Sequence, residues 1–126
     1  MPVAQRQCLN CGMRVAALRF GLDETPPVLL CPKCDENLYL QSDGSCLTVD
    51  IAHSRETTGQ AVQKLDDVLL AGWQGYCREL RLIVGGSLIR EHILGQLHYY
   101  HQHGRLPGYR EESPNKGAVI VTLRKP

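Results

Sequence analysis

The sequence lacks long apolar runs, and it lacks an excess of charge of either sign. No stretch approaches the roughly 18 consecutive apolar residues of a membrane span, so we expect a protein without a transmembrane segment. Lys and Arg number 14 against 13 Asp and Glu, which gives a formal net charge of +1. Bulk charge therefore does not place the protein among strongly basic nucleic-acid binders, and phosphate binding has to come from a local cluster of side chains.

The N-terminal residues also lack the apolar run of a secretory signal. Because Met1–Arg6 has no such run, we expect a cytoplasmic protein whose cysteines stay reduced. A chain of 126 residues has room for one domain, or for a small metal-binding module followed by one compact domain.

Four of the six cysteines stand in two identical pairs, Cys8-Leu9-Asn10-Cys11 and Cys31-Pro32-Lys33-Cys34. Each C-x-x-C pair offers two sulfurs to one ion from a tight turn, and two such turns supply the four thiolates of a closed tetrahedral zinc site. The sequence therefore predicts one structural Zn²⁺ held by Cys8, Cys11, Cys31 and Cys34. The alternatives are two disulfides, an iron–sulfur site and a chance occurrence of the two pairs, and a reducing compartment argues against the disulfides.

Residues 1–40 form the first predicted unit. Short strands are expected at 14–20 and 28–30, joined by a loop at 21–27, which is the arrangement of a zinc ribbon with a cysteine turn at each end. A segment this short has too little core to fold alone, so its folding energy has to come from metal binding. Residues 41–45 are small and polar and read as a linker. Cys46 and Cys77 are expected to be small buried apolar residues.

The second predicted unit, residues 46–126, alternates strand and helix patterns. Strands are expected at 47–51, 80–84, 106–109 and 117–123. One helix follows a capping box at Thr57 and Gln60, and a second follows the glycine turn at Gly85. The order β-α-β-α-β-β predicts an α/β two-layer sandwich with parallel pairing across the helices, a final hairpin, and both helices on one face.

Several stretches of this second unit resemble the Smr (small MutS-related) domain. They are Leu65-Asp66-Asp67-Val68-Leu69-Leu70-Ala71-Gly72, Leu82-Ile83-Val84-Gly85-Gly86, Leu88-Ile89-Arg90 and Gly117-Ala118-Val119-Ile120-Val121-Thr122-Leu123. The resemblance covers about two-thirds of the chain and implies a fold like the C-terminal domain of translation initiation factor three. It also implies binding of DNA or RNA, which many family members cut.

Two family motifs differ in this sequence. The family has Asp-x-His-Gly after the first strand, whereas this chain reads Asp50-Ile51-Ala52-His53-Ser54. The family has His-Gly-x-Gly after the second strand, whereas this chain has Val84 in place of the histidine and a shorter turn, Gly85-Gly86-Ser87. The cysteine pairs are not part of the Smr pattern. Whether the protein is an enzyme therefore stays open at the level of sequence.

The ends of the first two strands of the second unit meet at one edge of the predicted sheet, where α/β proteins bind ligands. A glycine turn at a helix N-terminus offers free N–H groups and a positive dipole end to a phosphate. We therefore predict phosphate contacts from Gly85, Gly86, Ser87, Arg90, Arg55 and Lys116. His53 is the candidate general base, oriented by Asp50. A plain strand-to-helix turn and a loop histidine are the structural alternatives.

Three functions remain at this stage. The first is a nucleic-acid-binding protein with a structural zinc module, whose partner is DNA or RNA. The second is an Smr-type nicking endonuclease with a degenerate active site. The third is an adaptor that binds a protein partner and has lost the nucleic-acid chemistry.

Overall fold

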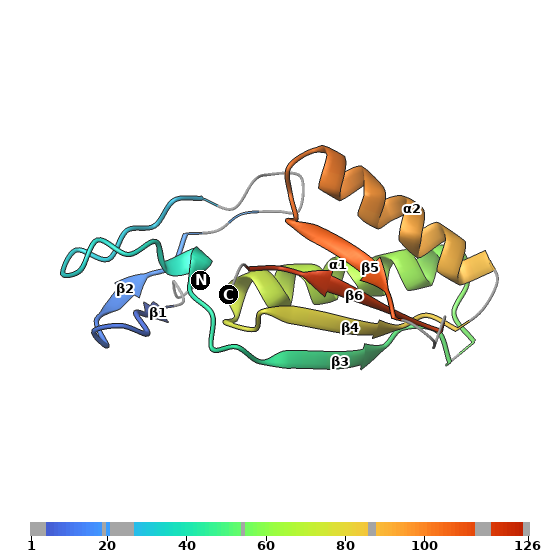
Figure 1. Ribbon diagram of the computed structural model, residues 1–126, viewed down its shortest axis with the longest axis horizontal. Helices are drawn as coiled ribbons and strands as arrows, with labels where there is room; N and C mark the ends of the chain where they lie inside the picture. The colour runs from blue at the N-terminus through green and yellow to red at the C-terminus, as the bar shows by residue number, and fades with distance from the viewer. Residues whose placement is uncertain are drawn as a thin grey trace.

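The computed structural model describes residues 5–18, 20, 27–53, 55–85, 88–112 and 117–124. A small cysteine-bearing module precedes a mixed α/β unit, which confirms the predicted fold class (Figure 1). The module contains strands β1 (Gln5–Gln7) and β2 (Arg14–Ala16) and the 3-10 helix η1 (Leu38–Leu40). The α/β unit contains, in chain order, β3 (Cys46–Asp50), α1 (Thr58–Gln74), β4 (Glu79–Ile83), α2 (Leu88–Gln102), β5 (Gly108–Glu111) and β6 (Ala118–Thr122).

The hairpin of the module surrounds the first cysteine pair. The strand predicted at 14–20 is present as the shorter β2 and pairs with β1, whereas the strand predicted at 28–30 is wrong. β1 and β2 are antiparallel and pair across the turn at Cys8–Cys11. Residues 28–30 form no strand, and Leu30 makes an isolated bridge with Asn37 across the second cysteine pair. Each cysteine turn reverses the chain by itself, so the segments that flank one turn pair with each other. Most of the loop predicted at 21–27 lies outside the described residues.

The four strands of the α/β unit stand in the order β3-β4-β6-β5. β3 and β4 are parallel, with Leu47 beside Leu80, and β5 and β6 pair as the predicted hairpin. The prediction that β4 pairs in parallel with the strand that follows α2 is wrong. β6 lies between β4 and β5 and is antiparallel to both. β6 buries Ala118, Val119 and Val121, whereas β5 buries no residue, so the more apolar strand takes the interior position.

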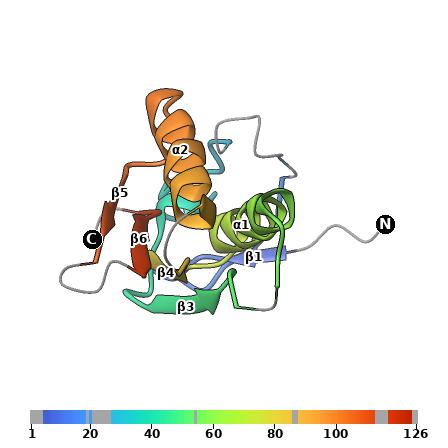
Figure 2. The same ribbon diagram turned by 90° about the vertical axis from the view of Figure 1, so that its right-hand side faces the viewer.

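Both helices cover one face of this sheet (Figure 2). α1 begins at the predicted capping box, in which the Thr57 hydroxyl accepts from the Gln60 N–H at 3.1 Å and the Gln60 side chain accepts from the Thr57 N–H at 2.9 Å. Gly75 ends α1. The two helices bury the apolar stripes expected from their periodicity, Ala61, Leu65, Leu69 and Trp73 from α1 and Ile93, Leu97 and Tyr100 from α2.

The module shares a core with the α/β unit. Phe20 and Tyr39 of the module lie in the same buried cluster as Leu69 and Trp73 of α1. The Phe20 and Tyr39 rings meet edge to face, with their centroids 5.3 Å apart. A second, smaller cluster contains Cys8, Cys31 and Leu38. The two units are therefore packed against each other, and the boundaries at residues 40 and 46 stay a prediction. In the part of the chain that the structure describes, no helix is long and apolar enough to cross a membrane.

Candidate functional site

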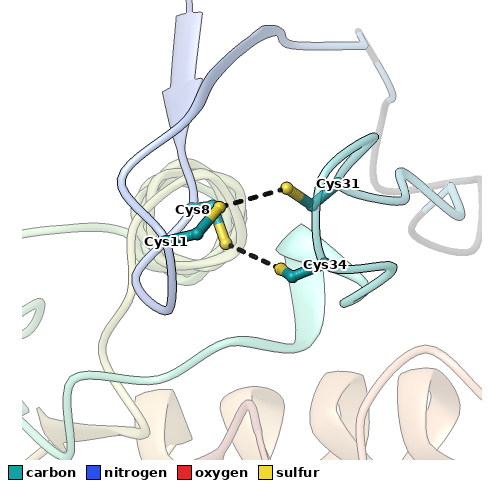
Figure 3. A group of neighbouring side chains, drawn as sticks. All are labelled: Cys8, Cys11, Cys31 and Cys34. Carbon is teal, nitrogen blue, oxygen red and sulfur yellow. Dashed lines mark hydrogen bonds between the residues drawn. The ribbon is translucent and has the colours of Figure 1, made fainter.

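The four cysteines of the two pairs converge on one point (Figure 3). The Cys8 and Cys34 sulfurs lie 3.5 Å apart, as do the Cys11 and Cys31 sulfurs, and all four lie within 4.8 Å of one another. Sulfurs that surround one Zn²⁺ at about 2.3 Å in a tetrahedron stand about 3.8 Å apart. The spacing of the donors therefore fits a single metal ion of that size, and the described cysteines form no disulfide.

The backbone gives both cysteine turns the same hydrogen-bond pattern. The Cys8 N–H donates to the Met13 carbonyl and the Gly12 N–H donates to the Cys8 carbonyl, both at 2.8 Å. In the second turn, the Cys31 N–H donates to the Glu36 carbonyl at 2.8 Å, and the Asp35 N–H donates to the Cys31 carbonyl at 2.9 Å. Gly12 (φ 81°) and Asp35 (φ 63°) hold the equivalent left-handed position, so Asp35 adopts a conformation that glycine adopts more easily.

The surroundings of Cys8 favour its thiolate. Burial opposes ionisation, but the backbone N–H groups of Cys11 and Asn10 and the Gln41 side chain stabilise the charged sulfur, and the pKa of Cys8 falls to about 6. The pKa of Cys31 is lowered too, since N–H groups of Lys33 and Cys34 outweigh its burial. The pKa of Cys11 moves the other way: the backbone N–H of Met13 favours its thiolate, but burial and the sulfurs of Cys31, Cys8 and Cys34 outweigh this and raise the pKa to about 11. Four sulfur donors suit a thiophilic cation.

Asp50 and His53 form a hydrogen-bonded pair at the carboxyl end of β3. The His53 Nδ1 atom lies 2.8 Å from Asp50 Oδ2, while Asp50 Oδ1 accepts from the backbone N–H of Ala52 at 2.9 Å and of His53 at 3.2 Å. The hydrogen bond from Ala52 is the main reason why the pKa of Asp50 is below its usual value. The carboxylate thus contacts the imidazole through Nδ1 and leaves Nε2 free of this contact.

His53 lines a cleft of about 520 Å³. The residues of this cleft belong to the end of the α/β unit where β3 and β4 end and α1 and α2 begin. The ribbon shows these strand ends and helix starts on the same side of the unit (Figures 1 and 2). Gly85 has φ 67°, and a Cβ placed on it would lie 3.9 Å from His53 Nε2. Gly85 therefore borders the imidazole in a left-handed conformation that glycine adopts more easily than other residues. The lining residues come from both loops and both helix starts: Ala52, His53, Glu56, Thr57, Thr58, Val84, Gly85, Leu88 and Ile89.

The sequence interpretation missed Glu56, which lines this cleft beside His53. The Glu56 side chain is only 4 % exposed and pairs with Lys64 of α1. Its carboxylate thereby ties the loop that carries His53 to the first helix. The available signal was a carboxylate placed directly before the N-cap Thr57, in the same short loop as Asp50 and His53.

Nothing among known protein families or curated proteins matches this chain. Among solved structures, the chain is similar to the Smr domain of Thermus thermophilus MutS2, with a TM-score of 0.53 and 23 % identity, over 63 % of this chain and 99 % of that one. The fold is that of an Smr domain. This likeness confirms the resemblance drawn from the sequence.

The Smr-like unit does not bring every predicted phosphate contact to the cleft. Arg90 pairs with Glu111 of β5 and is not among the residues that line the cleft. Arg55 is exposed, in a left-handed conformation with φ 60°, in the loop that carries His53. Gly86, Ser87 and Lys116 lie outside the described residues.

Cys46 and Cys77, which lie outside the two pairs, were both expected to be buried, and one of them is not. Cys46 begins the edge strand β3 of the Smr-like unit and is exposed, so the prediction of a buried residue is wrong. An edge strand has a neighbour on one side only, which explains why its first residue stays accessible. Cys77 is half-buried, and burial raises the pKa of its thiol.

Proposed function

We propose that this protein binds structured DNA or RNA at the His53 cleft of its Smr-like unit, and that its cysteine module holds one structural Zn²⁺. The observation that carries the proposal is the Asp50–His53 pair beside Gly85, in a cleft where two helices begin. The positive ends of α1 and α2 both favour a phosphate there. We also propose that the fold of the Smr-like unit is like that of the C-terminal domain of translation initiation factor three, and that the protein is cytoplasmic.

Phosphate contacts in this proposal come from backbone N–H groups and from the loop that carries His53. Gly85 borders the imidazole, and Gly86 and Ser87 follow it in the sequence. Arg55 is the exposed cation of this loop, and Lys116 directly precedes Gly117. Arg90 would first have to leave Glu111, so we assign it a smaller part. Contacts of this kind give affinity without reading the base sequence.

The binding test uses the zinc-loaded protein with labelled structured RNA and with branched DNA at two salt concentrations. We expect affinity to fall steeply with salt, because each neutralised phosphate releases counterions. Arg55→Ala should weaken binding and reduce that salt dependence. Absence of binding, or binding that salt does not change, would rule out the proposal.

A second candidate, nicking endonuclease activity, is favoured by the orientation of His53. With Nδ1 beside Asp50, the Nε2 atom can take the proton of an attacking hydroxyl, either from water or from a ribose 2′-OH. The new bond joins that oxygen to phosphorus, and the bond from phosphorus to the leaving oxygen breaks. Denaturing gels of the same samples show cut strands if this chemistry survives.

Variants separate binding from cleavage. His53→Ala should abolish cutting and leave binding nearly unchanged, and Asp50→Asn should slow cutting because the imidazole loses its acceptor. His103→Ala is the matched control, since His103 is an exposed histidine just beyond the far end of α2 and bonds to the Tyr99 carbonyl. Cleavage that persists in His53→Ala would exclude His53 as the base.

A third candidate, a protein-binding adaptor, is favoured by the surface of the cysteine module. Large apolar side chains of the module stay exposed on the first cysteine turn and in the segments beside both turns: Leu9, Met13, Leu18, Val28, Leu30 and Leu40. Defined partners that remain bound after nuclease treatment would support this function. Loss of all partners after that treatment would count against it.

A further inference from the structure

Gln41 was interpreted as the first residue of a linker, but its side chain is buried against the first cysteine turn. The residue is 8 % exposed. Its amide Nε2 donates to the Cys8 sulfur at 3.3 Å, and its Oε1 accepts from the Leu9 N–H at 2.9 Å. Both ends of one amide therefore hold the same turn, and the donor stabilises a sulfur that would bind metal.

The residues just before Gln41 connect this turn to the α/β unit. They form η1, which follows the second cysteine pair and contains Leu38 and Tyr39. The Leu38 carbonyl accepts from Arg6 Nε at 2.9 Å, and the Tyr39 carbonyl accepts from Arg124 Nε at 3.1 Å. Arg6 lies in β1, two residues before Cys8, so both metal-bearing segments lead to these arginines.

The same two arginines bind the C-terminal end of α1. Arg6 donates to the carbonyls of Gln74 and Gly75, and Arg124 donates to those of Gly72, Trp73 and Gly75. These are carbonyls that a helix end leaves without partners, at the negative end of the helix dipole. The end of α1 thus depends on the position of Arg6, and the first cysteine turn sets that position.

We propose that metal occupancy at the four cysteines controls the order of the C-terminal end of α1, with Arg6 as the connection and Gln41 as the residue that holds Cys8 in place. This inference rests on the proposed metal centre. The physical reason is that the module has only a small buried core of its own, Cys8, Cys31 and Leu38, so bonds to the ion have to supply much of its folding energy. Loss of the ion releases β1 and η1 together.

The protein carries its own reporter for this change. Trp73 is the only tryptophan in the sequence and lies in the last turn of α1, 5 % exposed. It shares the core with Phe20 and Tyr39 of the module, and the Arg124 guanidinium lies 5.7 Å from its ring. If the module separates from α1, Trp73 becomes exposed to water.

The first test removes zinc from the full-length protein with a chelator in the presence of a reducing agent. We expect a red shift of the Trp73 emission and at least about tenfold faster amide exchange at residues 71–75, with α2 as the unchanged reference. Added Zn²⁺ should reverse both changes. Zinc loss without either change would overturn the inference while leaving the metal centre in place. Purified protein that holds no zinc by elemental analysis would overturn both.

Two variants then test the named residues. Gln41→Leu should weaken Zn²⁺ binding about 10- to 100-fold, as loss of an outer contact to a metal ligand does. Gln63→Leu is the control, because Gln63 is an exposed glutamine on α1 that bonds to Asp67. The Arg6→Met variant should still bind Zn²⁺, but removal of the ion should no longer shift the Trp73 emission. Wild-type affinity in Gln41→Leu, or an unchanged emission response in Arg6→Met, would contradict the assigned roles.

Discussion

Arg6 and Arg124 donate to the same carbonyl oxygen, that of Gly75, at 2.8 and 2.7 Å. The two residues lie near opposite ends of the sequence, so the end of α1 is where the start and the finish of the described chain meet. Burial, together with repulsion from Arg6, lowers the pKa of Arg124 to about 10, which leaves the guanidinium charged at neutral pH. The rings of Tyr39 and Tyr76 lie 4.8 and 4.2 Å from the Arg6 guanidinium and favour its charge.

Replacing Arg124 should be among the most damaging changes to this fold. Arg124 is 1 % exposed and satisfies the carbonyls of Tyr39, Gly72, Trp73, Gly75 and Cys77. A buried acceptor without a donor costs about 1–3 kcal/mol, so we expect Arg124→Met to lose at least about 3 kcal/mol of the free energy of unfolding.

Urea denaturation of the zinc-loaded protein measures this loss. Arg110→Met is the matched control, because the Arg110 side chain is 60 % exposed and forms a surface ion pair with Glu79. A surface change of that kind should stay within about 0.5 kcal/mol. Equal losses in the two variants would show that the Arg124 contacts do not stabilise the fold.

Alanine substitutions at the helix glycines Gly95 and Gly72 should change the stability of the protein in opposite directions. A Cβ on Gly95 meets no described atom within 4 Å, so Gly95→Ala should stabilise the protein by about 0.5–1 kcal/mol. A Cβ on Gly72 would come within 2.5 Å of a Leu123 methyl and 3.3 Å of a Leu80 methyl, both buried. Overpacking of about 1–3 kcal/mol should outweigh the helix gain there, so Gly72→Ala should lower the thermal midpoint.

Gly12 and Asp35 should also differ, since they occupy the same left-handed position in the two cysteine turns. Gly12→Ala places a Cβ at φ 81°, at a cost of about 1 kcal/mol, which corresponds to a roughly fivefold loss of Zn²⁺ affinity. Asp35→Gly removes the strain and should bind Zn²⁺ at least as tightly as the native protein. Competition with a chromophoric chelator measures both affinities, and tighter binding by Gly12→Ala would contradict this account.

The ion pair between Arg81 and Glu112 should make stability depend on pH in acid. Arg81 bonds both oxygens of Glu112, at 2.6 and 2.8 Å, and this lowers the pKa of the Glu112 carboxyl below its ordinary value of 4.5. A lowered carboxyl pKa contributes stability above that ordinary value and loses it as the pH falls through the folded-state pKa. Glu112→Gln should therefore melt below the native protein at neutral pH, and the two melting temperatures should converge in acid. A constant difference at every pH would contradict this.

The chain shows two kinds of feature that its sequence predicted correctly. The cysteine pairs and the capping box at Thr57 and Gln60 depend on residues a few positions apart, whose geometry the local backbone imposes. The apolar stripes of α1 and α2 depend on periodicity, which is also local. The pairing of Asp50 with His53 belongs here as well, because three residues and one turn separate them.

Most of the features that only the tertiary structure decided join residues far apart in the chain. β6 enters between β4 and β5 because three strands compete for buried positions, a comparison that no single segment contains. Arg90 bonds to Glu111 across 21 positions, and Glu56 becomes buried only when Lys64 and the cleft surround it. Arg6 and Arg124 look in sequence like ordinary surface arginines. Their role follows from the helix end at Gly75, which exposes several carbonyls at one point that both chain ends can reach.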